Sequence, residues 1–490
     1  MKILMVAPES VPFVKVGGLA DVVGALSLAL ASKGHDVRLV LPKYASLNNS
    51  ESLELIEDCF MRVHLGIQDA YTRVWKTQFP NSSARAYFLE YNLFFGFGSV
   101  YKGPSGDESD NGYRFSFLSQ GALDLCNHLN WTPDIVHCHD WTTGTVPALL
   151  NTNYFNQPLG RAASIMTIHN LQHQGYFDQS LMAFSGLPKE LFREDGFESF
   201  GQINLLKGGL YHATKLTTVS PSYANEIQTE GYGCGLDPVV RLRSSDLIGV
   251  INGIDSLEWD PQKDASLASP FSLNDLDGKI DCKRQVQKRY GLEANLSLPL
   301  FGVVSRLYEQ KGLDLLVAII DRLMEHTNIQ IVVLGMGDPQ IEATFKNYSK
   351  QYKCRISAVL EFDNDLAHQT IAGIDFLLMP SRFEPCGLSQ MYAMKYGTVP
   401  IIRSTGGLID SVPVCLEDWA KGCGFSFESI DPEAFYDIIL TATNLYIQDK
   451  PSYKSMQYKG MESDFTWESS ASKYEEVYSW AKEARAEAFS

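Results

Sequence analysis

A loop in the C-terminal half of this chain carries one carboxylate where a sugar could be held. The segment SRFEPCG at 381–387 follows an apolar run at 376–379 and precedes a helical pattern at 388–395, which together predict strand, loop and helix. Its carboxylate is Glu384. A carboxylate accepts hydrogen bonds from two hydroxyls at once, and sugars present hydroxyls in pairs.

A second loop follows the next apolar run and suits a phosphate. The segment STGGL at 404–408 comes after the apolar residues 399–402 and places Thr405, Gly406 and Gly407 before another helix. Glycines there expose N–H groups to a phosphate that a helix start also attracts. Loops at the carboxyl ends of neighbouring parallel strands face one crevice, so the pair indicates a nucleotide-sugar site. The alternative is a surface carboxylate beside a plain turn.

A similar loop stands near the N-terminus. After the predicted strand 2–7, Lys15 precedes Gly17 and Gly18, and Asp21 lies just inside the helix that follows. The chain therefore has two Gly-Gly-Leu loops, each between a strand and a helix. We interpret them as one phosphate-binding loop in each half.

Two further cations could neutralise a diphosphate leaving group. No D-x-D cluster that would hold a metal ion is found at a strand end, so the positive charge must come from the protein. Arg306 and Lys311 fit that role, and Lys15 could add to it. A solvated lysine is the alternative for Lys311, but a cation at a helix start is disfavoured without an anion nearby.

Histidines cluster at the ends of two predicted strands. His137, His139 and Asp140 close one strand, and His169 and His173 follow another. A metal site is one interpretation, but no third ligand lies nearby in the sequence. The better functional interpretation is that these histidines form hydrogen bonds with sugar hydroxyls. The structural alternative is that they are partly buried and form hydrogen bonds within the protein.

Strand and helix patterns alternate along most of the chain, which predicts an α/β protein with two Rossmann-like domains. The pattern pauses after residue 251 in a polar, proline-containing stretch and resumes at residue 300. We predict an N-terminal domain at 1–251, a nucleotide-sugar domain at 252–465 and a C-terminal helix at 466–490.

Composition excludes several classes of partner. The formal net charge of -17 disfavours nucleic acid or an anionic membrane as a partner. No apolar run reaches the roughly 18 residues of a membrane helix. The nine cysteines are scattered without a C-x-x-C pair, which is typical of reduced thiols in the cytoplasm.

The ordered motifs of the chain resemble those of the bacterial glycogen synthase and plant starch synthase family. They are KVGGLADVVGAL at 15–26, HCHDW at 137–141, TIHN at 167–170, KGGLYHATKLTTVSPSYANEIQT at 207–229, INGID at 251–255, SRLYEQKGLDLL at 305–316, PSRFEPCGLSQMYAMKYG at 380–397 and STGGL at 404–408. The resemblance implies a GT-B arrangement, with two domains facing across a cleft and a C-terminal helix crossing back to the first. It also implies a retaining glucosyltransferase that needs no cofactor or metal and extends an α-1,4-glucan such as glycogen from ADP-glucose.

The resemblance also implies roles for single residues. Glu384 would bind hydroxyls of the transferred glucose, Arg306 and Lys311 would stabilise the leaving diphosphate, and His169 would line the reaction centre. The remaining substrate-binding residues would be Lys15, Gly17, Gly18, Asp21, Asp140, Asn252, Cys386, Gly387, Leu388, Tyr392, Thr405, Gly406 and Gly407.

Two departures from the family pattern concern the ligand pockets. Phe362 stands where the family often has tyrosine, which puts the preference for the base in question, and Phe97 stands where it often has arginine. The alternatives are therefore a UDP-glucose-dependent GT-B enzyme, a phosphorylase with pyridoxal, or a non-catalytic glucan-binding protein. The family is usually described as reacting on one sugar face, although Glu384 or Asp140 could serve a double displacement.

Overall fold

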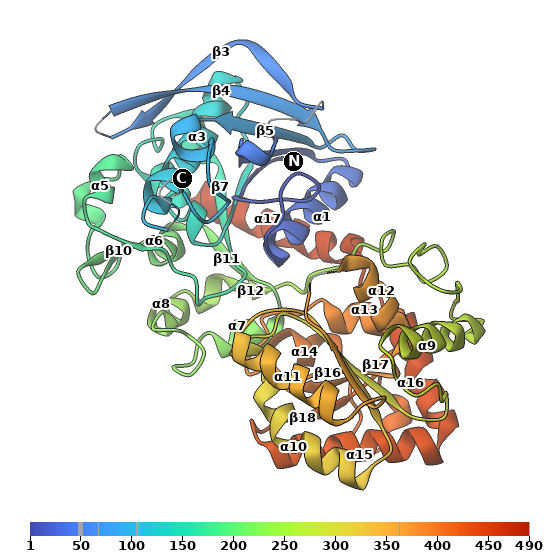
Figure 1. The fold of residues 1–490 in the computed structure, drawn as a ribbon. Helices are drawn as coiled ribbons and strands as arrows, with labels where there is room; N and C mark the ends of the chain where they lie inside the picture. Colours follow the sequence, from blue (N-terminus) through green and yellow to red (C-terminus); the bar gives the residue numbers. More distant parts are fainter. Residues whose placement is uncertain (48–51, 67, 104–105, 107, 362, 490) are drawn as a thin grey trace. The chain divides into compact units, whose positions relative to one another are not determined.

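The computed structural model describes residues 1–490 except 48–51, 67, 104–105, 107, 362 and 490. It divides the chain into two compact units (Figure 1). Unit 1 comprises residues 1–253 and 467–490, and unit 2 comprises residues 254–466. Phe362, the residue that bears on the choice of base, lies outside the described part.

Unit 1 is built on a nine-stranded sheet in the order β12-β11-β7-β6-β1-β2-β5-β4-β3. All neighbours are parallel except β3–β4 and β4–β5, which are antiparallel. The strands are β1 (Lys2–Val6), β2 (Asp36–Pro42), β3 (Glu54–Leu65), β4 (Gln68–Gln78), β5 (Arg85–Glu90), β6 (Ile135–His139), β7 (Ala163–Ile168), β11 (Lys215–Thr218) and β12 (Leu247–Gly249). The central strands are buried along nearly their whole length, which explains their continuous apolar runs.

Helices α1 (Gly18–Ser32) and α17 (Trp467–Glu487) share one core with this sheet. Tyr474 and Tyr478 of α17 are fully buried there. The prediction that the C-terminal helix returns to the first domain is confirmed, because α17 follows unit 2 in the sequence and packs in unit 1.

The other helices of unit 1 connect the strands. They are α2 (Asn92–Phe95), α3 (Asn111–His128), α4 (Val146–Asn151), α5 (Leu181–Phe184), α6 (Leu205–His212), α7 (Pro221–Glu226) and α8 (Asp237–Leu242). A separate three-stranded antiparallel sheet has the order β8-β10-β9, with β8 at Tyr176–Phe177, β9 at Glu198–Ser199 and β10 at Gln202–Asn204.

Unit 2 contains a six-stranded parallel sheet in the order β15-β14-β13-β16-β17-β18. Its strands are β13 (Leu300–Val304), β14 (Gln330–Leu334), β15 (Ile356–Val359), β16 (Phe376–Met379), β17 (Val399–Arg403) and β18 (Phe425–Phe427). Its helices are α9 (Asp277–Arg289), α10 (Leu313–His326), α11 (Pro339–Gln351), α12 (Asn364–Gly373), α13 (Ser389–Lys395), α14 (Gly406–Ser411), α15 (Pro432–Gln448) and α16 (Lys450–Glu462). Both predicted loops follow neighbouring strands, β16 and β17, and therefore lie at one edge of the sheet.

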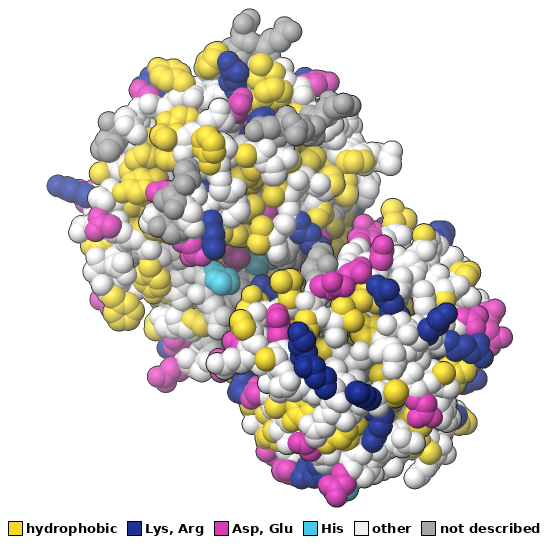
Figure 2. All heavy atoms as spheres, in the orientation of Figure 1, with side chains coloured by type: hydrophobic (Ala, Val, Ile, Leu, Met, Phe, Trp, Pro, Cys, Tyr) yellow, Lys and Arg dark blue, Asp and Glu magenta, His cyan; other side chains and the backbone are white. Residues whose placement is uncertain are grey.

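Charged side chains are distributed without a dominant sign over the face drawn in Figure 2. Both acidic and basic groups are visible on the surface of each unit. Among the described residues, no helix is long and apolar enough to span a membrane.

Candidate active site

In unit 2, the tertiary structure brings Glu384 and Lys311 together. The carboxylate of Glu384 is 6% exposed and lies 2.5 Å from the Lys311 Nζ. The Ser381 hydroxyl donates a second hydrogen bond to the same carboxylate oxygen at 3.0 Å. Two charges that would be costly to bury separately compensate each other here. The carboxylate predicted to bind sugar and the cation predicted to bind diphosphate are therefore neighbours.

Close backbone packing fixes the approach of Lys311 to the Glu384 loop. Gly312 has φ +64°, and a Cβ at that position would lie 1.9 Å from the carbonyl oxygen of Pro380. The N–H of Arg382 also donates to the Gln310 carbonyl at 2.8 Å. Only glycine meets both demands, so the Gly312 position keeps the Lys311 and Glu384 loops in contact.

The second loop of unit 2 is joined to the first through the backbone. The N–H of Gly407 donates to the Glu384 carbonyl at 3.0 Å, and a Cβ on Gly407 would lie 2.5 Å from the Cys386 Cα. This glycine is therefore required for packing, and its N–H already has a partner. Contact with the distal phosphate stays a prediction for Thr405, Gly406 and Gly407, at the start of α14.

Two buried side chains that the sequence analysis did not identify support these loops. The guanidinium of Arg403 donates to the carbonyls of Ser381, Arg382 and Glu428. The Gln390 amide donates to the carbonyls of Cys386 and Gly387, both at 3.0 Å. Neither residue belongs to a recognisable pattern of charges, and only the folded chain shows that they hold the backbone of the site.

The ring of Tyr392 is partly covered by another aromatic side chain, whereas Arg306 is exposed. The ring of Tyr392 stacks on Trp259, with ring centroids 3.8 Å apart, and Trp259 also stacks on His368 at 3.7 Å. One face of Tyr392 is thus covered by protein. Arg306 is exposed, its guanidinium lies 5.9 Å from the Tyr308 ring centroid, and the described residues offer it no carboxylate partner. Arg306 is therefore available to an anion.

The glycine loop of unit 1 is held by a buried carboxylate that the sequence analysis missed. Glu9, 2% exposed, accepts hydrogen bonds from the N–H groups of Val16 and Gly17 and from the Tyr101 hydroxyl at 2.8 Å. Burial raises the pKa of Glu9 above its usual value, and these hydrogen bonds oppose that rise. The sequence feature that could have identified Glu9 is its position, because a glutamate shortly after a buried first strand is an unusual residue to bury.

The glycine loop of unit 1 has open space at Gly18 and an exposed cation at Lys15, and a ligand could use both. A Cβ on Gly18, the first residue of α1, would meet no described atom within 4 Å. Lys15 pairs with Asp21 at 2.8 Å, and 54% of the lysine side chain is exposed. Such an exposed pair is weak, so an anion can compete for Lys15.

Three histidines of unit 1 form a stacked and hydrogen-bonded group: His137 and His139 are fully buried, and His169 is half-buried. His137 contacts the Tyr478 hydroxyl at 2.8 Å and the Thr167 hydroxyl at 2.6 Å. The Nδ1 of His139 lies 3.0 Å from the Nε2 of His169, while the Nε2 of His139 has no hydrogen-bond partner among the described residues. Within the described residues no group of three ligands suits a metal ion.

Burial keeps these rings neutral near pH 7. It lowers the pKa of His137 and of His169 to about 3, and that of His139 well below 6.5. Burial also raises the pKa of the Asp140 carboxyl to about 7, against hydrogen bonds from the N–H groups of His169 and Asn170. The group can therefore offer sugar hydroxyls neutral donors and acceptors.

Two residues of unit 1 have unusual local features. Asp140 has φ +54°, an uncommon backbone conformation for a residue other than glycine, and it accepts the His169 N–H at 2.7 Å. Asn252 is 5% exposed, and no described residue forms a hydrogen bond with its side-chain oxygen. Buried polar atoms are normally paired, so the Asn252 amide is well suited to a ligand.

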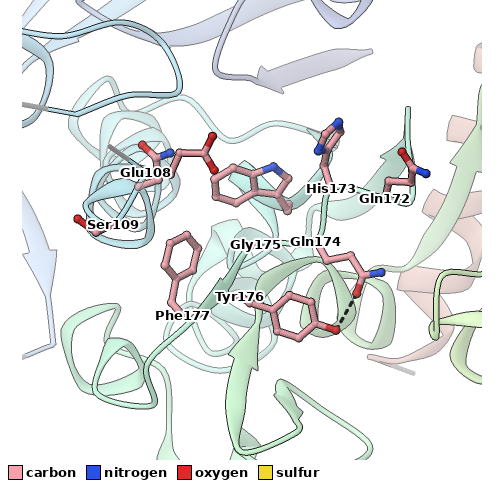
Figure 3. A pocket seen from close by; sticks show the side chains of 10 residues that line it. Glu108, Ser109, Gln172, His173, Gln174, Gly175, Tyr176 and Phe177 are labelled. Atoms are coloured by element: carbon pink, nitrogen blue, oxygen red, sulfur yellow. Dashed lines mark hydrogen bonds between the residues drawn. The ribbon is translucent and has the colours of Figure 1, made fainter. Parts of the chain in front are cut away.

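A cavity of about 460 Å³ opens in unit 1, and one of its lining residues is His173 (Figure 3). Its aromatic lining consists of Trp141, Tyr176 and Phe177, and its polar lining consists of Glu108, Ser109, Asn111, Gln172, His173 and Gln174, with Gly175 between them. Rings with a few convergent polar groups are typical of small-ligand sites. The sequence analysis recorded Trp141 only within HCHDW and did not predict this cavity.

Known proteins resemble the chain over almost its whole length. A model of the starch synthase catalytic domain matches residues 2–242, and a model of glycosyl transferases group 1 matches residues 287–462. Glycogen synthase 1 of Geobacter sulfurreducens is 44% identical over 481 residues, which are 98% of this chain and 96% of that protein. Glycogen synthase of Thermotoga maritima is 40% identical over 484 residues, 98% of each chain.

Solved structures extend the likeness to the fold. The catalytic domain of starch synthase IV from Arabidopsis thaliana, bound to ADP and acarbose, matches with a TM-score of 0.87 and 34% identity over 98% of this chain and 99% of that one. Sucrose-phosphate synthase from Thermosynechococcus elongatus, 18% identical, shares the fold with a TM-score of 0.61 over 98% of both chains. The predicted GT-B class of two Rossmann-like domains is thereby confirmed.

Proposed function

The chain belongs to the glycogen synthase and starch synthase family, as its motifs indicated, and on that premise we propose that it transfers glucose from ADP-glucose to the non-reducing end of an α-1,4-glucan with retention of configuration. The observation that carries the proposal is the buried Lys311–Glu384 pair, joined through Gly407 to the Thr405 loop. This arrangement supports a site in which Glu384 would bind sugar hydroxyls and Lys311 would bind phosphate.

The choice of donor is supported by a relative. The starch synthase IV catalytic domain, 34% identical, holds ADP. Arg306 and Lys311 would meet the charge of the diphosphate, with Lys15 as a third candidate. Preformed cations at the position where charge develops stabilise a transition state without reorganisation.

The aromatic cavity of unit 1 is the proposed acceptor site. Trp141 and Phe177 lie with ring centroids 5.8 Å apart, and the Tyr176 hydroxyl donates to the Gln174 side-chain oxygen at 3.1 Å. Such rings can pack against the C–H faces of glucose, while Gln172 and His173 offer partners for its hydroxyls. A neutral polymer is also compatible with the acidic net charge of the chain.

We propose a reaction on one face of the sugar. The bond from C1 to the diphosphate oxygen breaks, the acceptor hydroxyl oxygen bonds to C1 on the same face, and its proton passes to the departing phosphate oxygen. Glu384 is engaged with Lys311, and burial raises the pKa of Asp140 to about 7, so neither is well prepared as a nucleophile. Lys311 and Arg306 would stabilise the leaving diphosphate, and Glu384 would orient the glucose hydroxyls.

The test is nucleotide release from ADP-glucose and from UDP-glucose, each with and without glycogen. We expect release from ADP-glucose that depends on glycogen, and a product α-anomeric by NMR. Release from UDP-glucose alone would overturn the donor assignment. Release from neither would favour a non-catalytic glucan-binding protein, and a β-linked product would overturn retention.

A further inference from the structure

The turn between β9 and β10 presents an aromatic ring to solvent in an unfavourable backbone conformation. Phe200 is 92% exposed and has φ +53°, and Gly201 after it has φ +76°. A two-residue hairpin turn with positive φ at both positions favours Asn-Gly. A bulky side chain at positive φ is an outlier, and such outliers are found at functional sites.

Hydrogen bonds hold this turn in place. The Gly201 N–H donates to the Glu198 carboxylate at 2.8 Å, and the Lys207 Nζ donates to the Glu198 carbonyl at 2.5 Å. At the other end of β10, the Asn204 side chain accepts the Lys207 N–H and donates to Gln174 at 2.7 Å. The exposed ring is therefore carried by an anchored hairpin.

The same small sheet lines the aromatic cavity. Phe177 of β8 pairs with Ile203 of β10, and Tyr176 pairs with Asn204. At about 3.3 Å per strand residue, the turn at Phe200 lies on the order of 7–10 Å along the strand from the Phe177 register. An acceptor chain that leaves the cavity along this sheet would reach the turn after a short distance.

We propose that Phe200 is an outer aromatic subsite for the α-glucan acceptor, where a glucose unit distant from the reacting end packs on the ring. The inference rests on the proposed function, because it extends the acceptor site. A single exposed ring offers far less area than the roughly 1,000 Å² of a protein interface, whereas one sugar unit can cover it. A polymeric acceptor must also continue beyond a cavity of about 460 Å³.

The test compares acceptors of two lengths in wild-type protein and in Phe200→Asn. Asparagine suits the positive φ, so the variant should fold with an unchanged or slightly higher melting temperature. By calorimetry we expect maltoheptaose to bind about three- to tenfold more weakly and maltotriose to bind unchanged, as expected for the loss of one stacking contact. Phe200→Trp should restore binding of maltoheptaose.

A matched control is Phe60→Thr, which removes another exposed ring, 65% exposed, on β3. It should leave both affinities unchanged. Equal weakening of both sugars by Phe200→Asn, or no change for either, would overturn the subsite. A wild-type protein that binds maltoheptaose without transferring glucose would contradict the proposed function alone, and one that does not bind maltoheptaose would contradict both.

Discussion

The two Gly-Gly-Leu loops share a sequence pattern and differ in what holds them. In unit 2, the Gly407 N–H is bonded to the backbone of the Glu384 loop, and the space beside Gly407 is filled by the backbone of Cys386. In unit 1, the N–H groups of Val16 and Gly17 are bonded to the Glu9 side chain, and the space at Gly18 is open to 4 Å among described atoms. One loop is locked by packing, whereas the other leaves room for a ligand.

The ion pairs beside the two loops differ in the same way. The side chains of Lys311 and Glu384 are 17% and 7% exposed, whereas those of Lys15 and Asp21 are 54% and 27% exposed. Breaking a buried pair leaves an uncompensated charge, while an exposed pair contributes little to stability. The comparison teaches that one sequence pattern can serve a rigid site in one unit and an adaptable one in the other.

The largest effect is expected from removing the buried cation. Lys311→Ala should lower the free energy of unfolding of unit 2 by about 3–5 kcal/mol, because the buried Glu384 carboxylate loses its compensating positive charge. Turnover should fall by about a hundredfold or more, because a charge that stabilises the leaving group is lost. Denaturant unfolding and initial rates with ADP-glucose and glycogen measure the two effects.

Two controls sharpen this result. Lys15→Ala should change the free energy of unfolding by less than about 1 kcal/mol while weakening donor binding. The double variant Lys311→Ala with Glu384→Gln should recover much of the lost stability and none of the activity. If Lys15→Ala were as destabilising as Lys311→Ala, the contrast between the two pairs would be wrong.

An intermediate effect is expected from adding one methyl group to each loop. Gly407→Ala should lower the free energy of unfolding by about 1–3 kcal/mol, because the Cβ would overlap the Cys386 backbone. Gly18→Ala should leave stability unchanged or raise it by less than about 1 kcal/mol, and should instead raise the KM for ADP-glucose. Equal melting temperatures for the two variants would contradict the proposed difference in packing.

The smallest effect concerns acid sensitivity in unit 1. The folded pKa of His137, about 3, lies below the 6.5 of the unfolded chain, so the unfolded state binds more protons between these values and stability falls as pH drops below about 6.5. His137→Gln should reduce that slope by at most about 1.4 kcal/mol per pH unit. Glu9 and Asp140, whose pKa values are raised, act in the opposite direction and are present in both proteins.

A comparison of wild-type and His137→Gln unfolding between pH 5 and 7.5 isolates the histidine. Parallel stability curves for the two proteins would mean that His137 is not a neutral buried group in the folded state.

Sequence patterns predicted the structure correctly where the interacting residues lie close together in the chain. The strand–loop–helix order around Glu384 and Gly407 follows from apolar runs, a proline and glycines within about 30 residues, and these residues do lie together. Lys311 was predicted as a cation for the diphosphate; the structure pairs it with Glu384, an anion within the chain, and its contact with phosphate stays a prediction. Tyr392 was predicted near the nucleotide, yet stacking on Trp259 from the segment after the first domain covers one of its faces.

What the amino-acid order specified was therefore the type of each element, the glycine positions where a backbone must pass closely, and the charges that needed partners. The identity of those partners required the folded chain, because Glu9 meets Tyr101 across 92 residues and His137 meets Tyr478 across 341. Such contacts leave no periodic signal, since each depends on how sheets and helices stack. The aromatic cavity follows from the same cause, because its lining comes from residues 108–109, 111, 141 and 172–177, which only tertiary packing brings side by side.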